Sequence, residues 1–210
     1  MSAADKRLIC FDLGGVLVRI CRSWEEGLHA AGLDADRGWT PADSGGAHHD
    51  LVTAYTVGAI NDDAFFEGLA CVSGGAYSAS DFRAIHAAWI IGEYPGSAET
   101  LGELRAAGLT LACLSNTNGS HWGTMLGWPS LRALHHRHAS HLLGVAKPEP
   151  AIYSKCAAAC GAAPERIVFF DDLVENIDAA RAVGWDAVLV DSAGDPAAQI
   201  RRTLGERGLV

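Results

Sequence analysis

Short apolar runs alternate with longer amphipathic segments along most of the chain. Four runs, at residues 8–11, 109–114, 167–170 and 187–190, are almost wholly apolar, and each stops at a polar residue. Such runs are typical of strands buried on both faces of a sheet. Helical periodicity follows at residues 98–107, 151–159 and 176–183, each shortly before a glycine. We therefore expect an α/β fold, a doubly wound (Rossmann-like) parallel sheet, with a weaker strand near residues 134–139 and a closing helix at 195–207.

One long stretch interrupts this alternation. Residues 19–94 show no convincing strand pattern, whereas helical patterns occur at 24–31, 48–57, 62–72 and 80–91. We therefore predict a small all-helical cap domain, residues 19–94, inserted after the first strand. The α/β core would then comprise residues 1–18 and 95–210.

Polar residues follow the predicted strands at the points where ligands bind in a doubly wound sheet. Six of them stand directly after a strand or in a proline-bordered loop: Asp12, Ser115, Asn116, Lys147, Asp171 and Asp172. A carboxylate can attack phosphorus and form an aspartyl-phosphate. Clustered carboxylates require a cation, and oxygen ligands favour Mg²⁺. A lysine and a hydroxyl then hold phosphoryl oxygens, so the pattern predicts phosphoryl transfer.

Four ordered motifs carry a family resemblance. They read FDLGGVL at residues 11–17, LSNT at 114–117, KPEPAIY at 147–153 and FFDDLVEN at 169–176. The chain resembles the haloacid dehalogenase-like (HAD) hydrolases over nearly its whole length. It looks most similar to their bacterial glucose-1-phosphate (sugar phosphate) phosphatase branch, in which an Asp-Leu-Gly-Gly first motif occurs.

The resemblance implies a set of roles. Asp12 would be the nucleophile, Ser115 a hydrogen-bond donor to phosphate, and Lys147 the cation that steadies both. The implied Mg²⁺ ligands are Asp12, the backbone carbonyl of Gly14, Asp172 and a supporting Asp171. Contacts to phosphate or substrate are expected from Gly14, Gly15, Ser115, Asn116, Lys147 and His121. Asn176, one helical turn after Asp172, is either a further site residue or simply the start of a helix.

One departure from the family pattern concerns Gly14. Phosphatases of the family usually carry there an Asp that protonates the leaving group and then activates water, and such a group is typically worth about 10² to 10⁴-fold. We interpret the chain as a slower or differently assisted phosphatase, with His48 or His49 as candidate proton donors. Two alternatives stay open. One is a metal-independent haloacid dehalogenase, in which the pair Asp171 and Asp172 would be a useless anionic cluster. The other is a catalytically weak phosphate-ligand sensor or interaction protein.

The sequence supports a site role less strongly for several other residues. The cluster His135, His136, His138 and His141 resembles metal ligands by composition, but we expect solvated or packing roles. Aromatic and histidine side chains of residues 19–94 are candidate substrate contacts, although at helical spacing they are more often core: Trp24, Trp39, His48, His49, Tyr55 and Trp89. No GxGxxG follows the first strand, so a dinucleotide-binding enzyme is disfavoured.

The composition of the chain excludes some classes of binding partner. The chain has 16 basic and 25 acidic residues, a formal charge of −9 and 49% hydrophobic residues. This balance argues against nucleic acid and anionic membranes as the main partner. The family resemblance implies a small phosphorylated metabolite instead. Six scattered cysteines without a CxxC pair fit idle thiols in a reducing compartment. The start lacks a signal-peptide pattern, so we expect a cytoplasmic protein; the oligomeric state is left open.

Overall fold

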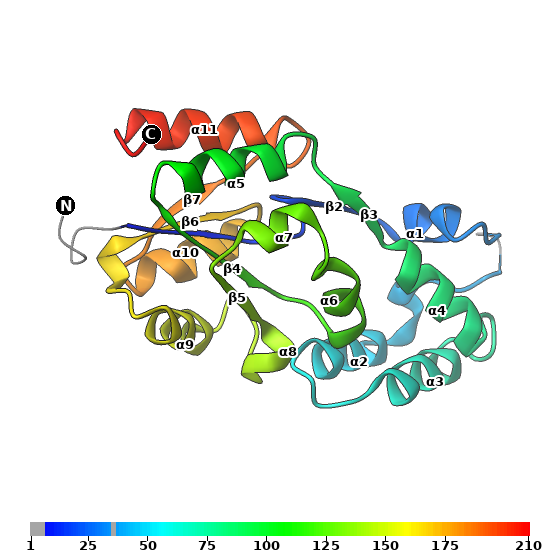
Figure 1. Ribbon diagram of the computed structural model, residues 1–210. Helices are drawn as coiled ribbons and strands as arrows, with labels where there is room; N and C mark the ends of the chain where they lie inside the picture. The colour runs from blue at the N-terminus through cyan, green and yellow to red at the C-terminus, as the bar shows by residue number, and fades with distance from the viewer. Residues whose placement is uncertain (1–6, 35–36) are drawn as a thin grey trace.

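A five-stranded parallel sheet forms the centre of the protein (Figure 1). The computed structural model describes residues 7–34 and 37–210. The strand order is β5-β4-β1-β6-β7. The strands are β1 (Leu8–Phe11), β4 (Thr110–Ser115), β5 (His136–Ala139), β6 (Ile167–Asp171) and β7 (Asp186–Leu189). The predicted parallel α/β sheet is therefore confirmed, including the weaker strand, which lies at one edge.

Helices cover both faces of the sheet because successive strand residues point to opposite sides. Ile9 and Phe11 of β1 belong to one hydrophobic cluster, which includes residues of α5 (Ser97–Ala106) and α11 (Pro196–Glu206). Leu8 and Cys10 belong to a second cluster with α9 (Pro150–Cys160) and α10 (Val174–Ala182). Figure 1 shows α5 and α11 on one side of the sheet and α9 and α10 on the other. All four helices lie close to their predicted positions.

Three short helices between β4 and α9 were not predicted. They are α6 (Gly119–Met125), α7 (Pro129–Ala133) and α8 (Ser140–Leu143). Each is too short to display helical periodicity, and α6 contains two glycines. A 3₁₀ turn, η3 (Pro164–Arg166), leads into β6.

Residues 24–88, here called the helical segment, surround an aromatic cluster of their own. The segment contains α1 (Trp24–Ala30), the 3₁₀ helix η2 (Pro41–Ser44), α2 (Ala47–Thr56), α3 (Asp62–Val72) and α4 (Ala79–Ala88). Its hydrophobic core includes Trp39, Tyr55, Phe65, Phe82 and Ile85. Figure 1 shows these helices beside the sheet's helical layers rather than within them. The division into core and cap at residues 19 and 94 stays a prediction.

The expectation that residues 19–94 contain no strand was wrong. β2 (Val18–Ile20) and β3 (Ile90–Glu93) pair antiparallel at the two ends of the helical segment. The helix predicted at 80–91 ends at Ala88 and begins after the N-cap Ser78. Each strand is too short for a strand pattern to be recognised in the sequence. The pairing joins residues some seventy positions apart, for example Val18 and Glu93. Only the return of the chain to the sheet brings them together.

Candidate active site

Asp12, Lys147 and Asp171 form a buried charged cluster at the carboxyl edge of the sheet. β1 and β6 are neighbours with Phe11 in register with Phe170, so the residues after them meet. Lys147 Nζ lies 3.0 Å from Asp12 Oδ1 and 2.6 Å from Asp171 Oδ2. All three side chains are buried. The structure thus brings together three residues that are up to 159 positions apart in the sequence.

The loop before α9 delivers Lys147, and Asn116 holds that loop. The Asn116 side-chain amide donates to the Lys147 carbonyl at 2.8 Å, and its Oδ1 accepts from the Lys147 N–H at 2.8 Å. This two-point attachment joins the end of β4 to the lysine loop. Asn116, expected to contact phosphate, is used here to position Lys147.

Asp171 is fully engaged by protein donors. Its Oδ1 accepts from the Leu173 N–H at 2.9 Å and from Asn176 Nδ2 at 3.0 Å, while Oδ2 accepts from Lys147 and from Asn176 Nδ2 at 3.1 Å. Asn176, which is buried, therefore contacts the site. Asp171 fits a positioning role better than a direct metal ligand.

Arg22 was not anticipated in the site. Its Nη1 lies 2.8 Å from Asp172 Oδ2, across 150 positions of sequence. Burial opposes the charge of Arg22, but the hydrogen bond and charge of Asp172 outweigh it and raise the Arg22 pKa. Nothing in the motifs points to this residue, because it lies outside them and between β2 and α1.

The donor set suits a hard divalent cation. Ligand oxygens of Asp12, Asp171 and Asp172 all lie within 4.8 Å of one another. Across residues 7–34 and 37–210, no hydrogen bond or ion pair engages Asp12 Oδ2 or Asp172 Oδ1. Mg²⁺ is bound in proteins through one or two carboxylates together with substrate phosphate. Asp12 and Asp172 would therefore hold the ion, with the carbonyl of Gly14 as the implied third protein ligand.

Burial and mutual attraction shift the pKa values of the charged groups in this cluster. Burial raises the pKa of Asp12 to about 6, although the nearby Lys147 charge acts in the opposite direction. Burial alone would lower the pKa of Lys147, but the charges of Asp12 and Asp171 outweigh it and raise that pKa. The lysine is therefore a permanent cation of the site.

The glycines after Asp12 have distinct constraints. Gly15 has φ +82°, and an added Cβ would collide with the Asp172 carboxylate and the Arg22 guanidinium. The three atoms nearest to a Cβ at Gly14 would all belong to the Ile20 side chain, with Cδ1 at 3.1 Å, a tight contact that Ile20 must relieve by a small shift. Ile20 thus borders the position where an acid would stand.

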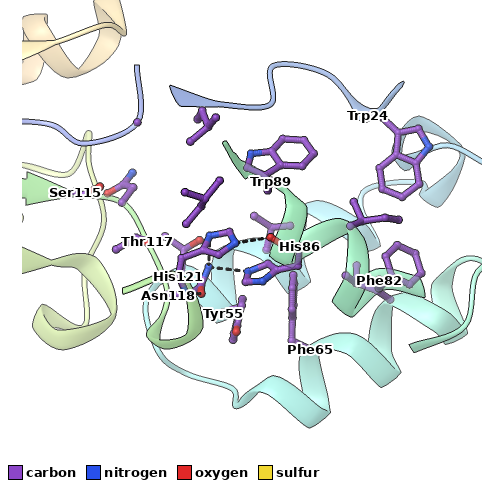
Figure 2. A pocket seen from close by; sticks show the side chains of 18 of the residues that line it. Trp24, Tyr55, Phe65, Phe82, His86, Trp89, Ser115, Thr117, Asn118 and His121 are labelled. Carbon is purple, nitrogen blue, oxygen red and sulfur yellow. Dashed lines mark hydrogen bonds between the residues drawn. The ribbon is translucent and has the colours of Figure 1, made fainter. Parts of the chain in front are cut away.

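A cavity of about 450 Å³ opens beside these residues (Figure 2). Gly14, Arg22, Ser115 and Asn116 belong to its wall at the end nearest the charged cluster, and Ser115 is buried. Four of the expected contacts from residues 19–94 line it, namely Trp24, His48, Tyr55 and Trp89. Two others do not: Trp39 lies within the aromatic cluster, and His49 is exposed. They were chosen by composition, which does not tell which face of a helix meets the cavity.

His121 lines the cavity as expected, together with His86, which sequence reasoning missed. Their rings stack with centroids 3.6 Å apart. Asn118 Nδ2 lies 3.1 Å from His86 Nε2, its Oδ1 accepts from the His121 N–H at 3.0 Å, and His121 Nε2 lies 2.7 Å from the His86 carbonyl oxygen. Figure 2 shows the trio between Thr117 and the aromatic wall.

The clustered residues His135, His136, His138 and His141 do not line this cavity. His135 Nδ1 accepts from the Leu111 N–H at 3.1 Å, which is a packing role. His136 and His138 project ligand atoms within 4.8 Å of each other and of Cys160. All six cysteines are free. Among the described residues, no helix is long and apolar enough to cross a bilayer.

Comparisons with known proteins agree with this geometry. Phosphatase MT3486 of Mycobacterium tuberculosis is 32% identical over 121 residues, which make up 56% of this chain and 55% of that protein. (S)-2-haloacid dehalogenase 4A of Burkholderia cepacia is 31% identical over 104 residues, 49% of this chain and 45% of that protein. The aligned regions thus span about half the length of these curated relatives.

Solved structures share the fold. A HAD family enzyme of Bacteroides thetaiotaomicron in a magnesium complex has a TM-score of 0.78 at 21% identity, covering 93% of this chain and 98% of that one. A dehalogenase structure has a TM-score of 0.64 at 21% identity, covering 89% of this chain and 85% of that one. The family model for haloacid dehalogenase-like hydrolases matches residues 6–184. Because that match spans most of the chain, the protein belongs to the haloacid dehalogenase-like hydrolase family.

Proposed function

We propose that the protein is a Mg²⁺-dependent phosphatase that hydrolyses a small phosphorylated metabolite through an aspartyl-phosphate. The observation that carries this proposal is the buried lysine shared by Asp12 and Asp171, with Asp172 beside them. The similarity to a phosphatase and the magnesium and phosphate complexes of the Bacteroides thetaiotaomicron enzyme support it.

In the proposed first step, one carboxylate oxygen of Asp12 attacks phosphorus and the bond from phosphorus to the substrate oxygen breaks. The leaving oxygen takes a proton and departs as an alcohol. In the second step, water attacks the phosphorus of the aspartyl-phosphate, which releases inorganic phosphate and restores the Asp12 carboxylate. Lys147 and the Ser115 hydroxyl hold phosphoryl oxygens throughout. When bound, Mg²⁺ offsets the negative charge of the carboxylates and the phosphoryl group.

The proton for the leaving group has no obvious carboxylic donor. Gly14 supplies none, and Ile20 lies against it. Of the two proposed replacements, His48 lines the cavity whereas His49 is exposed. His48 packs against Trp39, whose ring contacts Trp24 and Phe82 at the cavity end away from Ser115 (Figure 2). We therefore propose water as the proton source, which fits a slow phosphatase.

A metal-independent dehalogenase remains the competing function because dehalogenases are among the similar proteins. A halide leaving group needs no cation. The carboxylates Asp12, Asp171 and Asp172, within 4.8 Å of one another, would then keep one negative charge more than Lys147 and Arg22 supply in positive charge. We therefore favour the phosphate ester.

The helical segment is proposed to close over the bound substrate as a cap and to exclude water. A cytoplasmic location also stays a prediction from the sequence. The resemblance to sugar-phosphate phosphatases makes sugar phosphates one candidate substrate class. The side chains that line the cavity would select among such substrates.

A colorimetric assay tests the function. The protein is incubated with p-nitrophenyl phosphate in Mg²⁺ and then in chelator, alongside Asp12→Asn as the matched variant of nearly equal size. We expect turnover that requires Mg²⁺ and is lost in Asp12→Asn. Halide release from a 2-haloacid in chelator would favour the dehalogenase. Phosphate binding without turnover across a broad panel of phosphate esters would favour the sensor.

A further inference from the structure

The cavity beside the carboxylates has a hydrocarbon wall. Six of the side chains that form it are Tyr55, Phe65, Phe82, Ile85, Trp89 and Met125. Within the described parts of the chain, no Asp or Glu lines the cavity. Figure 2 shows Ser115 and Thr117 at one end and the aromatic side chains of Trp24 and Phe82 at the other.

Several polar groups along this wall are committed to one another, whereas Trp24 Nε1 is buried without a hydrogen-bond partner among the described residues. Asn118 bonds to both His86 and His121, and His121 Nε2 bonds to the His86 carbonyl oxygen. Tyr55 donates its hydroxyl to Asp62 Oδ1 at 2.7 Å. These groups are therefore mostly unavailable to the several hydroxyls of a sugar.

The charges also lie at one end. Arg22 is paired with Asp172 beside the site. Burial, together with the charge of His121, lowers the pKa of His86 to about 3, so that its ring is neutral near pH 7. A polyhydroxylated ring entering this cavity would lose water without gaining equivalent partners, and each unpaired hydroxyl costs affinity.

We infer that the substrate is a phosphate monoester whose leaving group carries an apolar, ring-sized hydrocarbon rather than a sugar. This inference rests on the proposed phosphatase function and names its substrate class. A cavity of about 450 Å³ falls within the range of small-ligand sites and accommodates a six-membered ring beside the phosphate.

Two nearly isosteric esters provide the test. Cyclohexylmethyl phosphate and glucose 6-phosphate both place a six-membered ring on a primary CH₂–O–phosphate, and they differ in the ring oxygen and hydroxyls. Because both leave as primary alcohols, leaving-group acidity does not favour the apolar ester. We expect kcat/KM for cyclohexylmethyl phosphate to exceed that for glucose 6-phosphate by at least about 100-fold, since burial of two or more of the sugar hydroxyls without a partner costs roughly tenfold each.

Acetyl phosphate, measured in parallel, separates the two hypotheses because its small leaving group hardly uses the cavity. Hydrolysis of acetyl phosphate with equal rates for the two ring esters, or a preference for glucose 6-phosphate, would overturn the substrate class and leave the phosphatase function standing. If the protein hydrolyses none of the three compounds in Mg²⁺, the phosphatase function itself is overturned.

A variant pair locates the preference in the cavity wall. Met125 lines the cavity on α6 and lies outside the charged cluster. Met125→Gln places an amide in the wall at similar volume, and Met125→Leu keeps the wall apolar. We expect the glutamine to reduce the cyclohexylmethyl preference about tenfold, and the leucine to change it less than about threefold. Calorimetric binding of both esters to Asp12→Asn should show the same order of affinity; equal affinities there would contradict the inference without relying on turnover.

Discussion

Removal of the Lys147 ammonium should destabilise the metal-free protein strongly. Lys147→Met preserves the length of the side chain but leaves Asp12 and Asp171 as neighbouring buried carboxylates. In the native protein the ammonium lies 3.0 Å and 2.6 Å from them. At an effective dielectric constant of about 20, each such pair is attracted by about 5–6 kcal/mol before the cost of desolvation.

The net effect is smaller than this attraction because burial of all three groups has already cost free energy. Breaking a buried ion pair by removing one partner typically costs about 3–5 kcal/mol, and we expect that loss at pH 7.5 in chelator. The loss should shrink at pH 5, because burial raises the pKa of Asp12 to about 6 even with the lysine present. Protonated Asp12 no longer repels Asp171.

Urea unfolding followed by circular dichroism measures these free energies. Lys155→Met is the matched control, because Lys155 is exposed and its ammonium donates to the Leu143 carbonyl oxygen at 2.7 Å. It should cost less than about 1 kcal/mol. The double variant Lys147→Met/Asp171→Asn should be more stable than Lys147→Met alone, since it removes one of the two stranded charges.

A loss below about 1 kcal/mol in Lys147→Met, or a double variant less stable than the single one, would refute the reasoning. Either result would mean that the carboxylates are already neutral or hydrated in the metal-free protein. The shared lysine would then not be what holds the cluster together.

Three further perturbations test other parts of the site. Gly15→Ala should weaken Mg²⁺ binding measured by calorimetry and cost about 1–3 kcal/mol of stability, because φ is +82° and the methyl would collide with Asp172; unchanged binding would contradict this. Gly14→Asp should raise kcat for alkyl phosphates at least about tenfold while aryl phosphates change little, since only poor leaving groups need the added acid; an unchanged ratio would show that another group already donates the proton. The free energy of unfolding of the wild type should decrease as the pH falls below 6.5, because the pKa of His86 is about 3 in the folded protein and the unfolded chain takes up the proton first. In urea titrations, the decrease at pH 5 should be about 2 kcal/mol larger for the wild type than for His86→Phe, and parallel pH profiles would refute this.

The sequence alone was sufficient for the sheet and for the identity of its polar edge. Strands buried on both faces must be nearly all apolar, so the runs around Leu8–Phe11 and Ile167–Asp171 stand out without any tertiary information. Parallel strands end at the same edge, and this rule predicts that Asp12 and Asp171 lie at one edge of the sheet. That β1 and β6 are neighbours, which brings the two side chains together, is seen only in the structure. The order of the helices followed from the same alternation.

Other features depended on the tertiary structure, because they join residues whose patterns are locally ambiguous. The pairing of Val18–Ile20 with Ile90–Glu93 exists only once the helical segment returns the chain to its starting point. Arg22 has no motif, and its contact with Asp172 spans 150 positions. Asp171 and Asp172 are adjacent and chemically identical, yet packing fills both oxygens of Asp171 and leaves one oxygen of Asp172 without a protein partner among the described residues.

The substrate cavity shows this division most clearly. Aromatic residues at helical spacing in residues 19–94 predict a hydrophobic interior, and Trp39 and Phe65 both belong to one. Phe65 also lines the cavity, whereas Trp39 does not. Hydrophobic periodicity reports only that a side chain avoids water, and a packed core and an apolar ligand satisfy that requirement equally. The sequence therefore determined the fold and the carboxylates of the candidate site, while the packing of the helices decided which apolar side chains line the cavity.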